Sequence, residues 1–231
     1  MQENIRHRIE RTRNRHSRAI YRDDTIVIRL ARNLSAGEQR EHIEHLLQRM
    51  HGKVLKERRR TAIDPFRPLL EGASTTTLNL GNGTSYRLSL SPGPRTKATR
   101  TSDGWRITVS PGVRRKQLHR FLWTLLGDLE RPRIAALVEE TNAATLRVHI
   151  RRIRIGYAAS QWGSCSYRGD IMLSALLLLL PEELLRYVII HELAHCLERN
   201  HSPRYWRNVE RVLPPWKILR SRLLAFRICS L

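Results

Sequence analysis

The sequence between His191 and His201 constrains the fold more than any other stretch of the chain. It reads His-Glu-Leu-Ala-His, and after five further residues it adds a third histidine, His201. Residues four apart lie on one face of an α-helix, so His191 and His195 can present two imidazoles to one ion. Zinc in a catalytic site usually takes three protein ligands and keeps one coordination position open. The spacing therefore predicts a zinc site with His191, His195 and His201 as its ligands.

Glu192 lies between two of these histidines and is not required as a ligand. A carboxylate in this place can accept a proton from a water molecule that zinc activates. The same residues would also fit two surface histidines on an amphipathic helix that binds no ion. The third histidine, the apolar residues before His191 and the signals at the helix ends favour the metal site, with Glu192 as its catalytic base.

Signals for helix ends flank the motif. Pro181 suits a first helical position, and the two acidic residues after it suit the positive end of the helix dipole. Asn200 tolerates the left-handed conformation that often ends a helix, and a turn there would bring His201 back toward the other histidines. Ser202 followed by Pro203 predicts the start of a further helix.

The composition narrows the class of protein. The 231 residues suffice for one large domain or two small ones, and 41% of them are hydrophobic, so the chain is not disordered. The formal net charge is +21, and 37 of the 42 basic residues are arginine. This excess would suit non-specific binding of nucleic acid through a basic surface. The alternative, which the even spread of the arginines favours, is a compositional bias over a solvated surface.

The cysteines and the apolar segments bear on the compartment. Three cysteines, with no Cys-x-x-Cys motif, indicate a reducing compartment rather than a disulfide framework. Residues 1–18 are basic and polar, without the apolar segment of a signal peptide. The longest apolar run, residues 171–180, is too short to span a bilayer. We therefore expect a cytoplasmic protein with no membrane partner, while the sequence leaves the oligomeric state open.

Upstream of the motif, a strand–turn–helix pattern occurs twice, 79 residues apart. In the first copy, alternating residues from Ile26 to Leu30 predict a strand, and Ser35 with Glu38 forms a capping box before a helix. In the second copy a similar strand precedes a helix over residues 116–129. Because identical residues are few, the pattern is either a true repeat or a recurrent β–α arrangement.

These patterns divide the chain into three parts. Residues 1–75 hold a basic arm and the first β–α unit, residues 76–149 hold the second unit, and residues 150–231 form the catalytic region. The alternative is that residues 76–231 form one compact domain.

Glycine and proline mark turns within these parts. Gly81-Asn82-Gly83 predicts the turn of a hairpin, and Pro132 is expected to separate two helices. A turn around Gly169 places another hairpin just before the metal-binding helix. The exposed edge of that hairpin could bind an extended peptide by strand addition.

Several segments together resemble the YgjP-like metal-dependent hydrolases, which are related to the SprT-like and WLM zincins. The match is most specific over residues 150–217 and continues upstream in register. The residues that carry it lie at 162–165 (Trp-Gly-Ser-Cys), 176–181, 187–195, 200–203 (Asn-His-Ser-Pro) and 205–206 (Tyr-Trp).

The resemblance implies an α+β fold with a zincin-like metallopeptidase core. In such a core the HExxH helix packs on a small sheet, preceded here by a strand-rich β–α region. It also implies metal ligands at His191, His195 and His201 and a catalytic base at Glu192. Gln161, Ser174 and Arg186 replace the arginine, asparagine and aspartate usual in the family, and none of the three is a ligand. Gln161 and Ser174 lie near the strand expected to bind substrate, so these two departures bear on substrate preference.

The function that we predict is zinc-dependent hydrolysis of a peptide or protein substrate. One alternative is a metal-dependent nucleotide pyrophosphatase or phosphohydrolase, since some members of the family are described in that way. It would require cationic groups that converge on the phosphates. Another alternative is a nucleic-acid-binding protein with a structural zinc, which would require a fourth protein ligand.

Three residues near the motif invite further roles. Cys196 follows a predicted ligand directly, but on a helix it points about 100° away from His195, so a core or rim position is expected. Arg204 and Tyr205 could each donate a hydrogen bond to the oxyanion of a tetrahedral intermediate. Helix packing for Tyr205 and solvation for Arg204 explain them equally well.

Overall fold

The computed structural model describes residues 5–22, 25–58, 60–158 and 160–228 and shows a mixed α+β protein. The chain forms two compact units, Met1–Thr61 (unit 1) and Ala62–Leu231 (unit 2). The sequence suggested boundaries at residues 75 and 149, or one compact domain over residues 76–231. Residues 62–75 belong to unit 2 because Phe66 and Leu69 are buried in its core. None of the helices in the described ranges is long and apolar enough for a membrane span.

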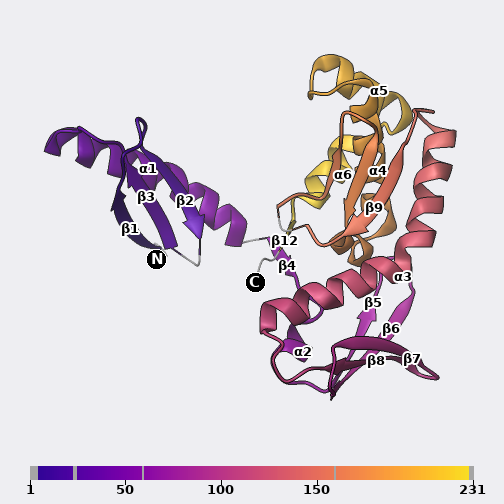
Figure 1. Cartoon of the computed structure of the whole chain (residues 1–231). Coiled ribbons are helices and arrows are strands. Elements are labelled where there is room, and N and C mark those ends of the chain that lie inside the picture. The colour runs from indigo at the N-terminus through magenta and orange to yellow at the C-terminus, as the bar shows by residue number, and fades with distance from the viewer. Residues whose placement is uncertain (1–4, 23–24, 59, 159, 229–231) are drawn as a thin grey trace. The chain divides into compact units, whose positions relative to one another are not determined.

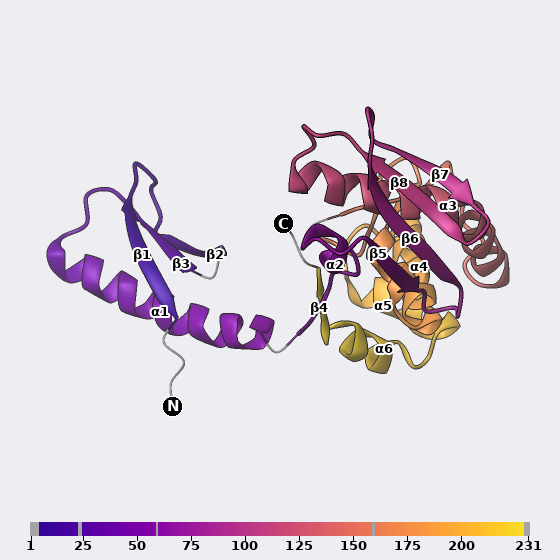
Figure 2. The same cartoon turned by 90° about the horizontal axis from the view of Figure 1, so that it is seen from below.

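Unit 1 is a three-stranded sheet with one helix (Figures 1 and 2). Its elements are β1 (Arg6–Arg11), β2 (Arg18–Arg22), β3 (Thr25–Leu30) and α1 (Ala36–Arg58). The strand order is β1-β3-β2, with β1 parallel and β2 antiparallel to β3. Ile26, Ile28 and Leu30 alternate along β3 and pack beneath α1, as their period-two pattern predicts. The strand predicted at 26–30 is therefore confirmed.

Two local features of unit 1 explain where its elements begin. The capping box before α1 is confirmed: the Ser35 amide donates to Glu38 Oε2 over 2.7 Å, and the Glu38 amide donates to Ser35 Oγ over 3.3 Å. Residues 6–11, expected as part of a basic arm, form β1 instead. Their pairing with β3 and the 2.9 Å bond from Arg29 Nε to Glu10 Oε2 order this segment.

Unit 2 holds three further sheets and the remaining helices of the described residues. In chain order its elements are β4 (Thr61–Ile63), α2 (Arg67–Leu70), β5 (Thr75–Asn79), β6 (Ser85–Pro92), β7 (Lys97–Thr101), β8 (Gly104–Val109), α3 (Arg115–Ala144), β9 (Arg152–Gly156), β10 (Gly163–Cys165), β11 (Asp170–Ser174), the 3₁₀ helix η1 (Ala175–Leu179), α4 (Glu182–Leu197), α5 (Pro203–Val212), α6 (Trp216–Leu223) and β12 (Phe226–Ile228). The sheets have the orders β5-β6-β8-β7 and β10-β11-β9, and β4 pairs with β12.

The elements of unit 1 recur in unit 2, displaced by 79 residues. β1, β2, β3 and α1 begin at residues 6, 18, 25 and 36, and β6, β7, β8 and α3 begin at 85, 97, 104 and 115. The third strand of each set pairs parallel with the first and antiparallel with the second. The antiparallel registers coincide, with Arg18 opposite Arg29 and Lys97 opposite Thr108. The parallel registers differ by two residues, which keeps each side chain on its face. The β–α pattern is therefore a structural repeat.

Pro132 does not separate two helices, contrary to the sequence-based prediction. α3 runs unbroken from Arg115 to Ala144 with Pro132 inside it, and it changes direction between its two halves (Figure 1). A proline removes one helical hydrogen bond. When the helical segments on both sides of the proline pack against the core, it usually bends the helix rather than ending it. Ile134 and Leu137 after the proline are buried, as are Leu122 and Leu126 before it, so packing holds both halves.

The small sheet β10-β11-β9 positions the helix that carries the HExxH sequence. β11 is the middle strand and runs antiparallel to β10 and parallel to β9. The turn predicted around Gly169 is confirmed, with a φ of 79° at this glycine. The apolar run that follows is a strand only to Ser174 and then tightens into η1. α4 contacts β10 and β11, and α3, α5 and α6 pack around it. Most of α4 is therefore buried.

Candidate metal centre

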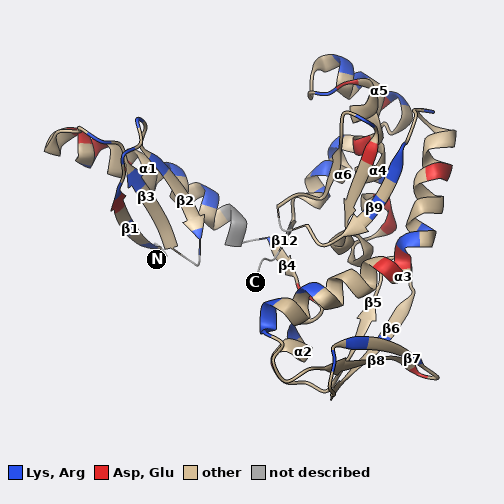
Figure 3. Cartoon of the chain, in the orientation of Figure 1, with Lys and Arg blue, Asp and Glu red and all other residues tan. Residues whose placement is uncertain are grey.

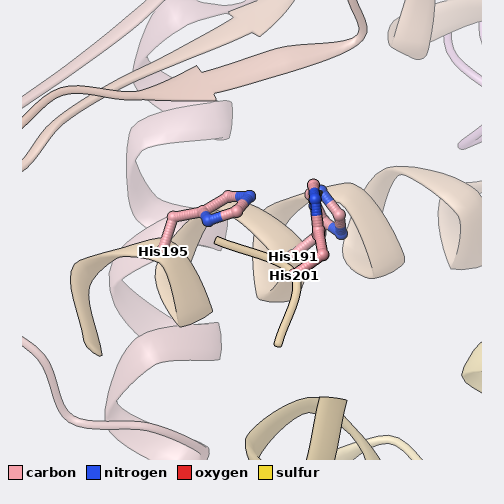
Figure 4. A group of neighbouring side chains, drawn as sticks. All are labelled: His191, His195 and His201. Atoms are coloured by element: carbon pink, nitrogen blue, oxygen red, sulfur yellow. Dashed lines mark hydrogen bonds between the residues drawn. The ribbon is translucent and has the colours of Figure 1, made fainter. Parts of the chain in front are cut away.

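α4 and the segment after it bring three imidazoles together (Figure 4). His191 and His195 lie one helical turn apart on α4, and His201 lies between α4 and α5. One ring nitrogen from each histidine lies within 4.8 Å of the other two, and the Nε2 atoms of His191 and His201 are 3.1 Å apart. The structure thus groups the three histidines that the sequence singled out, and the set could hold a metal ion.

The end of α4 sets the direction of the returning chain. The helix ends at Leu197, earlier than the predicted end near Asn200, and Glu198 is its extended C-cap residue. The carbonyl oxygen of Glu198 lies 3.1 Å from His195 Nδ1. A proton on Nδ1 satisfies this bond and leaves the Nε2 lone pair of His195 for an ion, which is how most metal-ligating histidines are oriented.

α5 begins as the sequence predicted. Ser202 is its N-cap residue and Pro203 its first residue, and Ser202 Oγ accepts a hydrogen bond from the Tyr205 amide over 3.3 Å. The Tyr205 hydroxyl donates to the His191 carbonyl oxygen over 2.9 Å, and the side chain is fully buried. Arg204 pairs with Glu198 at 2.8 Å. In this structure the Tyr205 hydroxyl therefore joins α5 to α4, and Glu198 holds the Arg204 guanidinium.

Burial keeps two of the imidazoles in the neutral form that metals bind. Desolvation, with smaller contributions from the neighbouring His195 and His201, lowers the pKa of His191 to about 3. Burial also lowers the pKa of His195, partly opposed by its bond to the Glu198 carbonyl. At neutral pH both rings therefore carry a free lone pair. The Nδ1 atom of His191 is buried and has no hydrogen-bond partner among the described residues.

The three-histidine arrangement fits a zinc ion. Zinc bonds to histidine nitrogen are about 2.0–2.1 Å long, so neighbouring ligand atoms of a tetrahedral site lie about 3.3–3.4 Å apart. The 3.1 Å between His191 Nε2 and His201 Nε2 is close to this separation. Two nitrogen lone pairs so close together repel each other unless a proton or a cation lies between them. Three nitrogen donors also match the usual ligand number of a catalytic zinc site.

Glu192 follows His191 on the same turn of α4 and is almost fully buried. Its side chain is 4% exposed, and burial raises its pKa to about 8, with a smaller contribution from nearby Cys165. Gly163 of β10 makes room for it: a Cβ atom built on this glycine would lie 2.6 Å from Glu192 Oε1. The strand therefore fixes the place of the carboxylate beside the histidines. Perturbed carboxyl groups of this kind cluster at functional sites.

A cavity of about 210 Å³ adjoins His191 and Glu192. Its walls come from β10, α4 and α6 and are mainly apolar. They are formed by Trp162, Gly163, Tyr187, Val188, His191, Glu192, Arg220, Leu223 and Leu224. Arg220 is the one cationic residue in this set, and its guanidinium lies 5.4 Å from the centre of the Trp206 ring. Trp206 in turn stacks on His201, at 5.4 Å, and on Trp216, at 4.0 Å.

The two described cysteines lie next to this centre. Cys165 on β10 and Cys196 on α4 are free, half-buried thiols whose sulfur atoms are 3.3 Å apart. Cys196 is not part of the histidine group, in agreement with the helical geometry. The third cysteine, Cys229, lies outside the described residues.

Comparisons with known proteins define the class as a metallopeptidase domain. The sequence model of the YgjP-like metallopeptidase domain matches residues 14–225, and the chain belongs to this family. The membership supports metal-dependent hydrolysis. No curated protein matches the chain. The solved structure of the metallopeptidase zymogen abylysin from Pyrococcus abyssi is 28% identical to the matched part, which covers 42% of this chain and 99% of that chain, with a TM-score of 0.38.

Two residues at the centre carry no recognisable signal of a role in the sequence. Gly163 stands in the Trp-Gly-Ser-Cys segment, but its contact with Glu192 depends on how β10 packs against α4. Arg220 lies among many other arginines in a helix predicted only to pack, and the fold alone brings it to the cavity.

Proposed function

We propose that the chain is a zinc-dependent metallopeptidase in which Glu192 is the general base. The observation that carries this proposal is the convergence of three imidazole nitrogens, all within 4.8 Å of one another, beside a buried carboxylate. His191, His195 and His201 would hold the ion. When bound, zinc acts as a Lewis acid that makes a water molecule nucleophilic near neutral pH.

Glu192 would move the proton in this reaction. The positive charge of a bound ion nearby would oppose the effect of burial and lower the pKa of Glu192 again, so that the carboxylate is the form present. This carboxylate would accept a proton from the attacking water and then donate it to the amine that leaves. Gly163 behind the carboxylate and the buried wall of α4 restrict its movement. Such positioning keeps the proton acceptor within reach of the reacting atoms.

The edge of the small sheet would hold the substrate. β10 is the outer strand in the order β10-β11-β9, and its Gly163 lines the cavity beside His191. An extended peptide added to this edge would form backbone hydrogen bonds there and present alternate side chains to one face. A side chain next to the cleaved bond would then enter the cavity of about 210 Å³.

Two other functions are less well supported. A nucleotide phosphohydrolase needs several cations around the phosphates, whereas Arg220 alone supplies a cation to the cavity lining. A closed structural zinc site needs a fourth protein ligand, and the group found within the described ranges has three members. The free thiols of Cys165 and Cys196 support the proposal that the enzyme works in the reducing cytoplasm.

The proposal is tested by loading the full chain with zinc and screening it against peptide and nucleotide panels. We expect one zinc per chain and hydrolysis in the peptide panel. His201→Ala should lower both zinc content and turnover, and His45→Ala, an exposed histidine of α1, should change neither. Full zinc retention by His201→Ala would refute the ligand assignment, and hydrolysis confined to nucleotides would refute the peptidase assignment.

A further inference from the structure

Within unit 1, no other described element covers one face of α1, and the repeat in unit 2 shows what can cover such a face. A groove of about 600 Å³ runs along this face, and we name it the α1 groove. It is lined by Arg40, Ile43, Glu44, Leu47, Gln48 and His51. Ile43 and Leu47 are half-buried at its floor, and the other side chains surround them.

The six counterparts of these residues, 79 positions later on α3, are all buried. They are His119, Leu122, Trp123, Leu126, Gly127 and Glu130. Leu78 of β5 lies against Leu122 and Leu126, and Phe66 packs on Trp123 with ring centres 4.9 Å apart. Tyr157, just after β9, stacks on Trp123 with ring centres 5.7 Å apart, and a Cβ atom built on Gly127 would lie 3.3 Å from the Ile155 carbonyl oxygen. The part of α3 that corresponds to the α1 groove is thus covered by β9 with Tyr157, by Leu78 of β5 and by Phe66 at the start of α2.

The two copies of the repeat also differ in whether the edge of their sheet is paired with a further strand. In unit 2, β5 pairs antiparallel with β6, the counterpart of β1. In unit 1, β1 is an edge strand that pairs only with β3 within the described residues. Ile9 of β1 lies opposite Ile28, whose side chain packs beneath α1, yet Ile9 remains 47% exposed. The unpaired backbone of an edge strand can bind an added strand, and an exposed apolar side chain beside it offers that strand an apolar contact.

We propose that the β1 edge and the α1 groove bind an extended peptide segment of a partner protein, placed as β5 is placed on β6. Apolar side chains at alternate positions of the peptide would pack on Ile9, Ile43 and Leu47, because a strand presents every second residue to one face. The polar residues of the groove tolerate water when it is empty, which suits a reversible contact. The site is separate from the metal centre and independent of the proposed activity.

Charge complementarity identifies the kind of segment. Residues 1–61 contain 16 basic and 8 acidic residues, a formal net charge of +8. Figure 3 shows Lys and Arg along the strands and the helix of unit 1. Arg6, Arg8 and Arg11 lie on β1 itself and are exposed or nearly so. The expected partner segment therefore alternates apolar with acidic residues, since opposite charges on neighbouring strands attract.

The test measures fluorescence anisotropy of a labelled eight-residue peptide that alternates leucine with glutamate. The full chain carries Glu192→Gln, so that hydrolysis does not consume the probe. We expect saturable binding with a Kd on the order of 10 μM. The leucine–lysine peptide should bind at least about tenfold more weakly, because like charges at the added strand repel.

Variants locate the binding. Ile9→Asp and Ile43→Asp should each weaken binding at least about tenfold, since a charge that repels the glutamates replaces an apolar contact. Leu55→Asp is the matched control, because it changes the net charge equally at an exposed apolar residue of α1 outside the groove, and it should bind nearly as the parent does. If circular dichroism shows that Ile43→Asp does not fold, the result for the exposed position Ile9 decides the test. Absence of saturable binding, or equal affinity in Ile9→Asp and Leu55→Asp, would overturn the proposal.

Discussion

At the scale of single residues, the absence of a side chain at Gly163 determines where the carboxylate of Glu192 lies. Any Cβ at this position would come within 2.6 Å of Glu192 Oε1 and 2.8 Å of its Cγ. The carboxylate is buried, so it has little space into which it can move. The catalytic geometry thus depends on a residue that performs no chemistry itself.

Gly163→Ala should lower the turnover of the zinc-loaded chain by at least about tenfold, because displacing a catalytic group by about 1 Å weakens catalysis strongly. The free energy of unfolding should fall by about 1–3 kcal/mol, as overpacking of a core usually produces. Steady-state kinetics and urea unfolding measure the two effects. Gly156→Ala on β9, where a Cβ meets nothing within 4 Å, is the control and should be nearly neutral. Equal turnover in both variants would contradict the positioning role of Gly163.

Arg220 should influence which substrates are cleaved. Arg220→Leu is expected to lower kcat/KM about tenfold, or about 1.4 kcal/mol, for peptides with glutamate or aspartate next to the cleaved bond. Cleavage of peptides with leucine there should change little, because the cavity is otherwise apolar. Arg222→Leu removes an arginine of the same helix that pairs with Glu183 at 2.5 Å and leaves the cavity untouched. Loss of the acidic preference in both variants alike would argue against a specific role for Arg220.

The residues of the centre differ in how far the sequence reveals them. His191, Glu192 and His195 follow from helical spacing, which is a local property, and the structure places them on one helix as predicted. Gly163 and Arg220 reach the centre only because β10 and α6 pack against α4. No local pattern encodes such contacts. The assignment of the histidines to zinc and of Glu192 to catalysis is the proposal made above.

At the scale of elements, the contact between β6 and α3 includes a hydrogen bond to a buried carboxylate. The Tyr86 hydroxyl donates to Glu130 Oε1 over 2.6 Å, and Arg133 Nε donates to Glu130 Oε2 over 2.6 Å. Burial, together with the hydrogen bond to Glu130, raises the pKa of Tyr86 to about 12. The neutral phenol is therefore the form that the fold stabilises.

Tyr86→Phe should lower the free energy of unfolding by about 1–3 kcal/mol at neutral pH, because a buried acceptor loses a partner. The pKa of Tyr86 is higher in the folded state than the reference value of 10.0, so its contribution is complete below pH 10 and is lost as the pH rises to about 12. The difference between parent and variant in urea unfolding should shrink over this interval. Tyr167→Phe, at an 88% exposed position, is the control. A difference that grows with pH would refute this account.

Local signals predicted the ends of several elements but not the course of α3. The capping box at Ser35, the N-cap at Ser202 and the turn at Gly169 each involve residues within a few positions, and the structure contains all three. The course of α3 past Pro132 depends on packing by both halves of the helix, which the proline alone does not reveal.

At the scale of the whole molecule, a weak sequence pattern corresponds to a repeated topology. Strand and helix boundaries recur 79 residues apart although few residues are identical, because the alternation that buries one face of a sheet constrains residue class rather than identity. The copies differ in what covers their helices, and this difference is the basis of the proposed peptide site in unit 1. The sequence could not show it, since the cover of α3 comes from segments outside the repeat.

Metal removal should destabilise unit 2 in particular. A ligand that binds only the folded state adds RT ln(1 + [L]/Kd), about 2.7–4.1 kcal/mol when it is present at 100–1,000 times its Kd. Calorimetry of the chain with zinc and then with a chelator should therefore show a Tm lower by several degrees. His201→Ala should show little response to the chelator. An identical Tm in both conditions for the parent would contradict metal binding by the folded chain.

The most direct test of the central claim compares zinc content and turnover in Glu192→Gln and the parent chain. Glutamine has a similar volume and is not asked to bind the ion, so zinc content and fold should remain. An amide cannot take the proton from the attacking water, so turnover should fall by about 10²–10⁴-fold, or about 3–5 kcal/mol of barrier. A zinc-loaded Glu192→Gln chain that hydrolyses the same peptide at the parent rate would contradict the claim.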